Sequence, residues 1–179
     1  MSSPPKPNDA LRAVSLFEAL SDQEIADISA IASFERFQAG EVLFRTGDEG
    51  RCMWIIVEGQ VDVYLDLDAP DHILASVRRR GILGELSLIE PTTRSACAIA
   101  QQDSLLLRID HEPFLALQDA LNPAPFKLLR ELSRLVCYRV RSVNKRIEQI
   151  SHDAINTEER RRTITDVLKM LWNPSEKHG

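Results

Sequence analysis

The chain has 179 residues, of which 44% are apolar and 27% are charged, the composition of an ordinary globular protein. A net charge of -5 at pH 7 argues against a surface that binds nucleic acid broadly. No apolar run approaches the ~20 residues of a membrane helix, and the start, MSSPPKPND, lacks the apolar core of a signal peptide. We therefore expect a cytoplasmic protein with no membrane partner and a disordered tail over residues 1–10.

The first predicted element is helical and covers residues 11–32. Ser21 stands three residues before Glu24, which is the spacing of a capping box at the start of a helix. Apolar residues then follow at helical spacing: Ile25, Ile28 and Ile31. One face of this segment is expected to be buried.

From about Ser33 the apolar pattern changes to a period of two, which is typical of strands. Strand-like runs lie at 42–45, 53–57, 61–65, 73–77, 96–100 and 105–109. Turn signals such as Gly47-Asp48-Glu49-Gly50 separate them. Short strands spaced ~8 to 12 residues apart predict an antiparallel β-sandwich or jelly roll, not βαβ units. The predicted fold class is α+β, a sandwich flanked by N-terminal helices and a long C-terminal helix.

After Ile109 the pattern is helical. Asp110 is expected to cap a short helix with Pro113 in its first turn, and Asn122-Pro123 to end it. A long helix follows over about residues 125–150, and its apolar residues recur with a period close to that of a coiled coil. These residues are Leu129, Leu132, Val136, Val140, Val143, Ile147 and Ile150. We expect the first half of the helix to pack on the sandwich and the second half to form a homodimer.

These predicted elements divide the sequence into four parts. The tail (1–10) is followed by a sandwich domain (11–123), a dimerising helix (124–150), and a short last helix with its tail (151–179). The last helix has an apolar face made of Ile164, Val167, Leu168 and Leu171.

Residues 84–96, GELSLIEPTTRSA, have the composition of a ligand-binding loop. Arg94 presents fixed donors that suit a phosphate, whereas the carboxylate of Glu85 accepts a hydrogen bond from a hydroxyl. Gly84 has no Cβ, so a ligand can approach the main chain there, and the next residues would open a short helix whose N–H groups face an anion. A ligand with a phosphate and a free hydroxyl close together uses both groups, which indicates a sugar phosphate or a nucleotide.

The stretch resembles the phosphate-binding cassette of the cyclic nucleotide-binding domain family, which includes catabolite activator protein and the regulatory subunits of the cAMP-dependent kinase. The cassette pattern is matched by Gly84, Glu85, Leu86, Ser87, Leu88, Arg94, Ser95 and Ala96. Upstream, Gly40-Glu41 and residues 47–50 and 56–59 resemble the first strands and hairpins of the family. Phe114 resembles the aromatic residue of the helix that follows the barrel. The resemblance covers about residues 12–150.

The resemblance implies a role for each matching residue. Arg94 would bind the cyclic phosphate, and Glu85 would accept a hydrogen bond from the ribose 2′-OH. Backbone N–H groups near Leu86 and Ser95 would complete the phosphate cradle, and the Ser95 hydroxyl would contact a phosphate oxygen or the base. The predicted ligand is cAMP in preference to cGMP, with no metal, although Ser95 does not decide between the two nucleotides.

The pattern leaves the base-binding residues open. Family residues that meet the base correspond to positions near Val140 and Arg141, and no Thr-Ser pair is present there. Arg141 would either stack on a purine or hydrogen-bond to it, or be a solvated charge of the helix. The predicted ligand-binding residues are Gly84, Glu85, Leu86, Ser87, Arg94, Ser95, Ala96 and Arg141.

The bacterial activators of the family continue into a helix-turn-helix domain, for which the 29 residues after Ile150 leave no room. Residues 127–162 hold ten Lys or Arg against five Asp or Glu, which is either a solvated helix face or a surface for an acidic partner. We expect a stand-alone receptor that acts on an unknown effector protein and does not bind DNA.

Three other classes of protein compete with the receptor. One is a transcription regulator, and another is a dimeric scaffold without a ligand, in which Glu85 and Arg94 pair with each other. An enzyme is not expected, because the four histidines are scattered and form no metal-ligand spacing. The three cysteines form no metal-ligand spacing either: Cys52, Cys97 and Cys137. We expect them to be reduced thiols in apolar surroundings.

Overall fold

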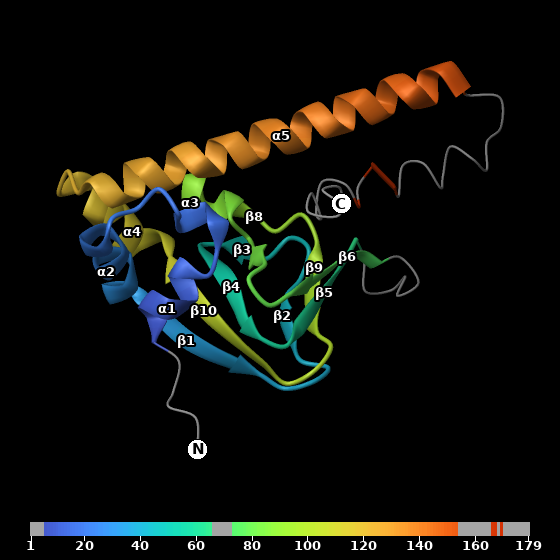
Figure 1. Cartoon of the computed structure of the whole chain (residues 1–179). Helices are drawn as coiled ribbons and strands as arrows, with labels where there is room; N and C mark the ends of the chain where they lie inside the picture. Colours follow the sequence, from blue (N-terminus) through green and yellow to red (C-terminus); the bar gives the residue numbers. More distant parts are fainter. Residues whose placement is uncertain (1–5, 66–72, 154–165, 168, 170–179) are drawn as a thin grey trace.

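The computed structural model of the chain describes residues 6–65, 73–153, 166–167 and 169 (Figure 1). The disordered tail predicted over residues 1–10 is wrong for residues 7–10, because Pro7 begins a helix. Pro is favoured at this position since its missing N–H has no helical partner. Most of the last helix predicted over 151–179 lies outside the described residues.

The described elements follow in chain order. The N-terminal segments are α1 (Pro7–Arg12), the 3-10 turn η1 (Ser15–Phe17) and α2 (Asp22–Ala30). The strands before the cassette are β1 (Ala32–Phe37), β2 (Val42–Phe44), β3 (Glu49–Gly50), β4 (Cys52–Glu58), β5 (Gln60–Tyr64), β6 (Ile73–Arg78) and β7 (Ile82–Leu83). The remaining elements are α3 (Leu86–Ile89), β8 (Thr92–Thr93), β9 (Cys97–Ala100), β10 (Ser104–Asp110), α4 (His111–Asp119) and α5 (Pro123–Asp153).

The strands form two four-stranded antiparallel sheets and one two-stranded ribbon. One sheet has the order β1-β10-β4-β7, the other has the order β2-β9-β5-β6, and β3 pairs with β8. Figure 1 shows α5 lying along one side of the sandwich, with α2 and α4 near its N-terminal end. The predicted α+β class, a sandwich flanked by helices, is confirmed.

Two apolar cores hold these layers together. Trp54 and Ile56 belong to the core between the sheets, whereas Met53 and Ile55 belong to the core under the helices. Successive side chains of a strand point to opposite faces, and both faces of β4 are covered. This explains why β4 is a continuous apolar run and does not alternate with polar residues.

The N-terminal helical region is anchored to the start of α5. Ser21 and Glu24 form the predicted capping box, and the Glu24 carboxylate also pairs with the Lys127 ammonium at 2.7 Å. The hydrogen bond from Lys127 is the main cause that lowers the pKa of Glu24. A second link joins α2 to the residue before α5, because the Asn122 side-chain amide donates to Asp27 at 2.7 Å.

The C-terminal helices differ from the prediction at their starts. Asp110 precedes α4 but its side chain caps no helix N–H, because its carboxylate pairs with Arg108 at 2.7 Å. Pro123 begins α5, so the helix starts earlier than predicted and Pro occupies a first-turn position. Across the described ranges, no helix combines the length and the apolar character that a membrane span requires.

Burial along α5 changes from its first half to its second. Leu128 and Leu132 are fully buried in the core under the helices, whereas Val140 is 49% exposed. Figure 1 shows the distal part of the helix extending past the sandwich. Cys137 is exposed, so the prediction of apolar surroundings is wrong for this thiol, whereas Cys52 and Cys97 are buried.

Candidate functional site

A cavity of about 250 Å3 lies where the GELSLIEPTTRSA stretch meets α5. Its lining residues are Phe44, Gly84, Glu85, Leu86, Ser87, Thr92, Thr93, Arg94, Ser95, Val136, Arg139 and Val140. The cavity therefore brings both ends of the stretch against the middle of the long helix. Such a concave site with a few convergent polar groups is the usual form of a small-ligand site.

Arg94 lies in a slot that small and neutral groups shape around its guanidinium. Its Nη1 donates to Ser87 Oγ and its Nη2 donates to the Cys52 carbonyl oxygen, each at 2.9 Å. A Cβ on Gly84 would lie 2.3 Å from Nη1, and a Cβ on Gly50 would lie 2.5 Å from Ser87 Oγ. Both glycines are therefore needed for the side chain to lie where it does.

The positive charge of Arg94 is buried and lacks an anion. The residue is 6% exposed, and burial lowers the pKa of its guanidinium. Within the described part of the chain, its hydrogen bonds go to a hydroxyl, a carbonyl and a thiol, and its Nε has no partner. A buried cation with a spare donor is costly, so the site is completed electrostatically when an anion enters.

Glu85 forms an ion pair with Arg139 of α5. The pairing with Arg94 that the scaffold alternative expects is therefore not the one observed. Both partners are buried, since the side chain of Glu85 is 4% exposed and that of Arg139 is 12% exposed. This ion pair ties α5 to the cassette, and it engages the carboxylate that was expected to meet a ligand hydroxyl.

The main chain of the cassette also presents free donors to the cavity region. Gly84 adopts a φ of 69°, a left-handed conformation that favours glycine, at the turn before α3. The N–H groups of Leu86 and Ser95 donate to no other group within the described ranges. Both residues line the cavity, so an anion bound near their N–H groups would displace no existing hydrogen bond.

All but two of the predicted ligand-binding residues line the cavity. Ala96 is fully buried in the core between the sheets and lies behind the wall of the site. Arg141 is exposed and is not among the lining residues. Arg139 reaches the cavity in its place, because residues two apart on a helix point to nearly opposite sides, and Val140 also lines the cavity.

Several functional residues were missed by reasoning from the sequence. Phe44 and Trp54 appear there as ordinary core residues of strands, yet both rings lie against the Arg94 guanidinium, with its carbon 4.7 Å and 5.0 Å from their centroids. No sequence signal marks the Cys52 carbonyl, because a backbone acceptor is independent of the side chain. Thr92 and Thr93 lie inside the quoted stretch but carried no predicted role.

The arrangement can hold one kind of small molecule. An anionic group fits against Arg94 and the free N–H groups, and a hydroxyl fits against Glu85. A β-sandwich with such a cavity, joined to a long helix that contacts the same cavity, has the architecture of a domain that binds a small ligand.

Comparison with known proteins agrees with this class. The family model described as the cyclic nucleotide-binding domain matches residues 34–120. The cyclic AMP receptor protein of Thermus thermophilus is 29% identical over 159 residues, which cover 87% of this chain and 69% of that protein.

Solved structures give the same result. The N-terminal domain of a transcriptional regulator from Streptomyces coelicolor A3(2) has a TM-score of 0.64 and 31% identity, covering 76% of this chain and 96% of that one. The catabolite activator protein of Thermus thermophilus has a TM-score of 0.66 and 26% identity, covering 76% of this chain and 62% of that one. The chain belongs to the cyclic nucleotide-binding domain family.

Proposed function

We propose that this chain is a receptor for a cyclic nucleotide, with cAMP preferred over cGMP. The observation that carries the proposal is Arg94, a buried guanidinium whose Nε has no partner among the described residues, at a cavity that also holds Glu85. The preference for cAMP is supported by the Thermus thermophilus relative, which is named a cyclic AMP receptor protein. No described group of His, Cys, Asp and Glu is arranged to hold a metal ion, and the proposed chemistry is binding without a reaction.

In the proposed complex, the cyclic phosphate lies against Arg94 and the N–H groups of Leu86 and Ser95. The ribose 2′-OH donates to Glu85, whose carboxylate is shared with or released from Arg139. Because Arg139 belongs to α5, a change in this ion pair changes how the helix is held against the cassette. Ligand binding thereby repositions α5 and the segment that follows it, which would regulate a partner protein.

The second half of α5 is the proposed homodimer contact. Val140, a member of the near-heptad set, is 49% exposed and lies on the part of the helix beyond its buried half. The predicted near-heptad spacing continues through this half, which suits packing against the same helix of a second copy. The expected domain boundaries, 11–123 and 124–150, follow the same division between the sandwich and the helix.

Isothermal titration with cAMP and with cGMP tests the function. We expect one nucleotide to bind with a dissociation constant near or below ~1 μM, which corresponds to about -8 kcal/mol. Arg94→Ala removes charge-assisted hydrogen bonds worth about 1.5–3 kcal/mol each, so binding should weaken by roughly tenfold to a hundredfold or more. Arg141→Ala is the matched control, because this arginine is exposed and away from the cavity. The absence of heat with either nucleotide would contradict the proposal.

A transcription regulator is the second candidate. It is supported by the similar Streptomyces coelicolor structure, which belongs to a transcriptional regulator, and by the excess of Lys and Arg over residues 127–162. A gel shift with mixed DNA pools at low salt, with and without cyclic nucleotide, separates the two functions. We expect no shifted band from this chain alone. A nucleotide-dependent shift would favour the regulator.

A further inference from the structure

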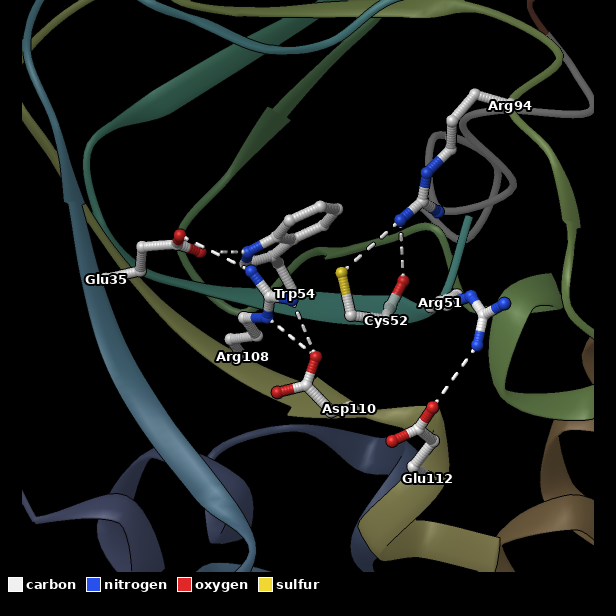
Figure 2. Close-up of polar contacts among 8 residues, drawn as sticks. All are labelled: Glu35, Arg51, Cys52, Trp54, Arg94, Arg108, Asp110 and Glu112. Carbon is white, nitrogen blue, oxygen red and sulfur yellow. Dashed lines mark hydrogen bonds and ion pairs between the residues drawn. The ribbon is translucent and has the colours of Figure 1, made fainter. Parts of the chain in front are cut away.

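A polar network lies next to the slot that holds Arg94 (Figure 2). Trp54 is 4% exposed and does not line the cavity. Its indole Nε1 donates to the Glu35 carboxylate at 2.7 Å. Glu35 lies 3.5 Å from the Arg108 guanidinium, which in turn pairs with Asp110 at 2.7 Å. The indole is thus held at its polar edge by a half-buried group of alternating charges.

The face of the same indole lies against the guanidinium of Arg94. The central guanidinium carbon of Arg94 is 5.0 Å from the Trp54 ring centroid and 4.7 Å from that of Phe44. The two rings are stacked, with centroids 5.7 Å apart and planes 14° apart. Aromatic faces attract a cation most strongly where it is desolvated, and Arg94 is only 6% exposed. Trp54 and Phe44 therefore supply part of the stabilisation that a carboxylate partner would otherwise give.

This contact bears on the direction in which Arg94 points. Only the Ser87 hydroxyl and the Cys52 carbonyl and thiol hydrogen-bond to the guanidinium within the described residues. These acceptors hold only the two Nη atoms, so the bonds alone leave the plane of the guanidinium free to tilt about the line that joins Nη1 and Nη2. An aromatic face that is itself fixed by a hydrogen bond to a carboxylate removes that freedom. The cation–π contact is thus a geometric constraint as well as a source of stability.

We propose that Trp54, oriented by Glu35, is a positioning residue for Arg94 that determines which exocyclic oxygen of a bound cyclic phosphate the guanidinium contacts. The inference rests on the proposed function, because it assigns a cause to the geometry of the same site. A Trp54 that only filled the core would stabilise the fold but would have no effect on the choice between the two exocyclic oxygens.

The two phosphorothioate diastereomers of cAMP provide the test, because each carries sulfur in place of a different exocyclic oxygen. A guanidinium fixed in one plane penalises sulfur at the oxygen that it contacts. We expect the wild-type protein to bind the two diastereomers with affinities that differ by at least about tenfold, the effect of losing one charge-assisted hydrogen bond. In Trp54→Leu the indole face is lost while the Phe44 ring remains, and the ratio should fall by about threefold or more from the wild-type value.

Ile56→Ala is the matched control, since Ile56 lies two residues along the same strand and in the same core but offers no aromatic face to a cation. Its loss should lower stability and leave the ratio of the two affinities unchanged. Trp54→Phe retains an aromatic ring without the donor to Glu35, and we expect an intermediate ratio. If Trp54→Leu does not fold, the ratio of the two affinities in Trp54→Phe tests the proposal by itself.

The outcomes separate the two proposals. A wild-type protein that binds neither unmodified cyclic nucleotide overturns the receptor function, and with it the role of Trp54. Suppose that the wild-type protein binds cAMP and prefers one diastereomer, and that both Trp54→Phe and Trp54→Leu keep the wild-type ratio of affinities. This result overturns only the role of Trp54. A ratio that falls in the Trp54 variants and stays constant in Ile56→Ala supports both.

Discussion

The ion pair between Glu85 and Arg139 provides a direct test of how α5 is held in the absence of ligand. We consider Glu85→Gln, Arg139→Met and the double variant, each unfolded with urea without nucleotide. The free energies of unfolding of the four proteins give the coupling between the two side chains. Because both side chains are almost completely buried, this coupling should exceed that of a surface pair.

The expected size follows from the burial of the pair. Removing one partner leaves the other charge buried and alone, which costs about 3–5 kcal/mol where water is excluded. The cavity beside Glu85 admits water, and that lowers the expected cost of each single substitution to about 2–3 kcal/mol. The double variant leaves no unpaired charge. We therefore expect a coupling free energy of about 2 kcal/mol.

A control pair lies on the same helix. Glu131 and Arg134 are three residues apart on α5, and the Arg134 side chain is 68% exposed. The same cycle on this pair should give about 0.5 kcal/mol or less. A coupling below about 0.5 kcal/mol for Glu85 and Arg139 would refute the reasoning, because it would mean that the buried pair holds α5 no better than a surface pair does.

Two further predictions concern the slot and the N-terminal anchor. Gly84→Ala places a Cβ against Arg94 in a left-handed conformation, so we expect a loss of stability of about 1–3 kcal/mol and cyclic nucleotide affinity reduced by more than about tenfold. Gly47→Ala carries the same backbone strain with no atom within 4 Å, and equal nucleotide affinities in the two variants would show that displacement of Arg94 is not the cause. The Lys127 ammonium lowers the pKa of Glu24, so the pair stabilises the fold above about pH 5 and this stability is lost as pH falls through the lowered pKa. Lys127→Met should therefore lower the melting temperature at pH 7 and flatten its decrease between about pH 7 and pH 3, and parallel curves for the two proteins would count against this linkage.

Local sequence patterns were sufficient for the layers of the fold. The capping box at Ser21 and Glu24 depends only on residues three apart, and the structure contains it. Strand periods and turn residues likewise predicted an antiparallel sandwich, because alternation and turn chemistry are local properties. The cassette pattern predicted Arg94 and Glu85 as ligand-binding residues, and both line the cavity.

The parts that could not be predicted depend on packing between distant segments. Whether Arg139 or Arg141 faces the cavity is decided by the rotation of α5 about its axis. The sequence pattern does not distinguish these two arginines. Trp54 and Phe44 are apolar residues of strands, so the sequence does not distinguish a ring that fills a core from one that lies over a cation. Asp110 has the sequence position of a helix cap, but its carboxylate pairs with the Arg108 guanidinium and caps no helix N–H group.

The continuity of α5 gives the molecule a mechanical property. Arg139 contacts the cassette near the middle of the helix, and the helix continues without a break to Asp153. At ~1.5 Å per residue, these last turns form a rigid arm roughly 21 Å long. A tilt of about 10° at the cassette would therefore move the far end by roughly 4 Å, about two thirds of the rise of one helical turn. The proposed change in one ion pair would in this way become a displacement large enough for another protein to detect.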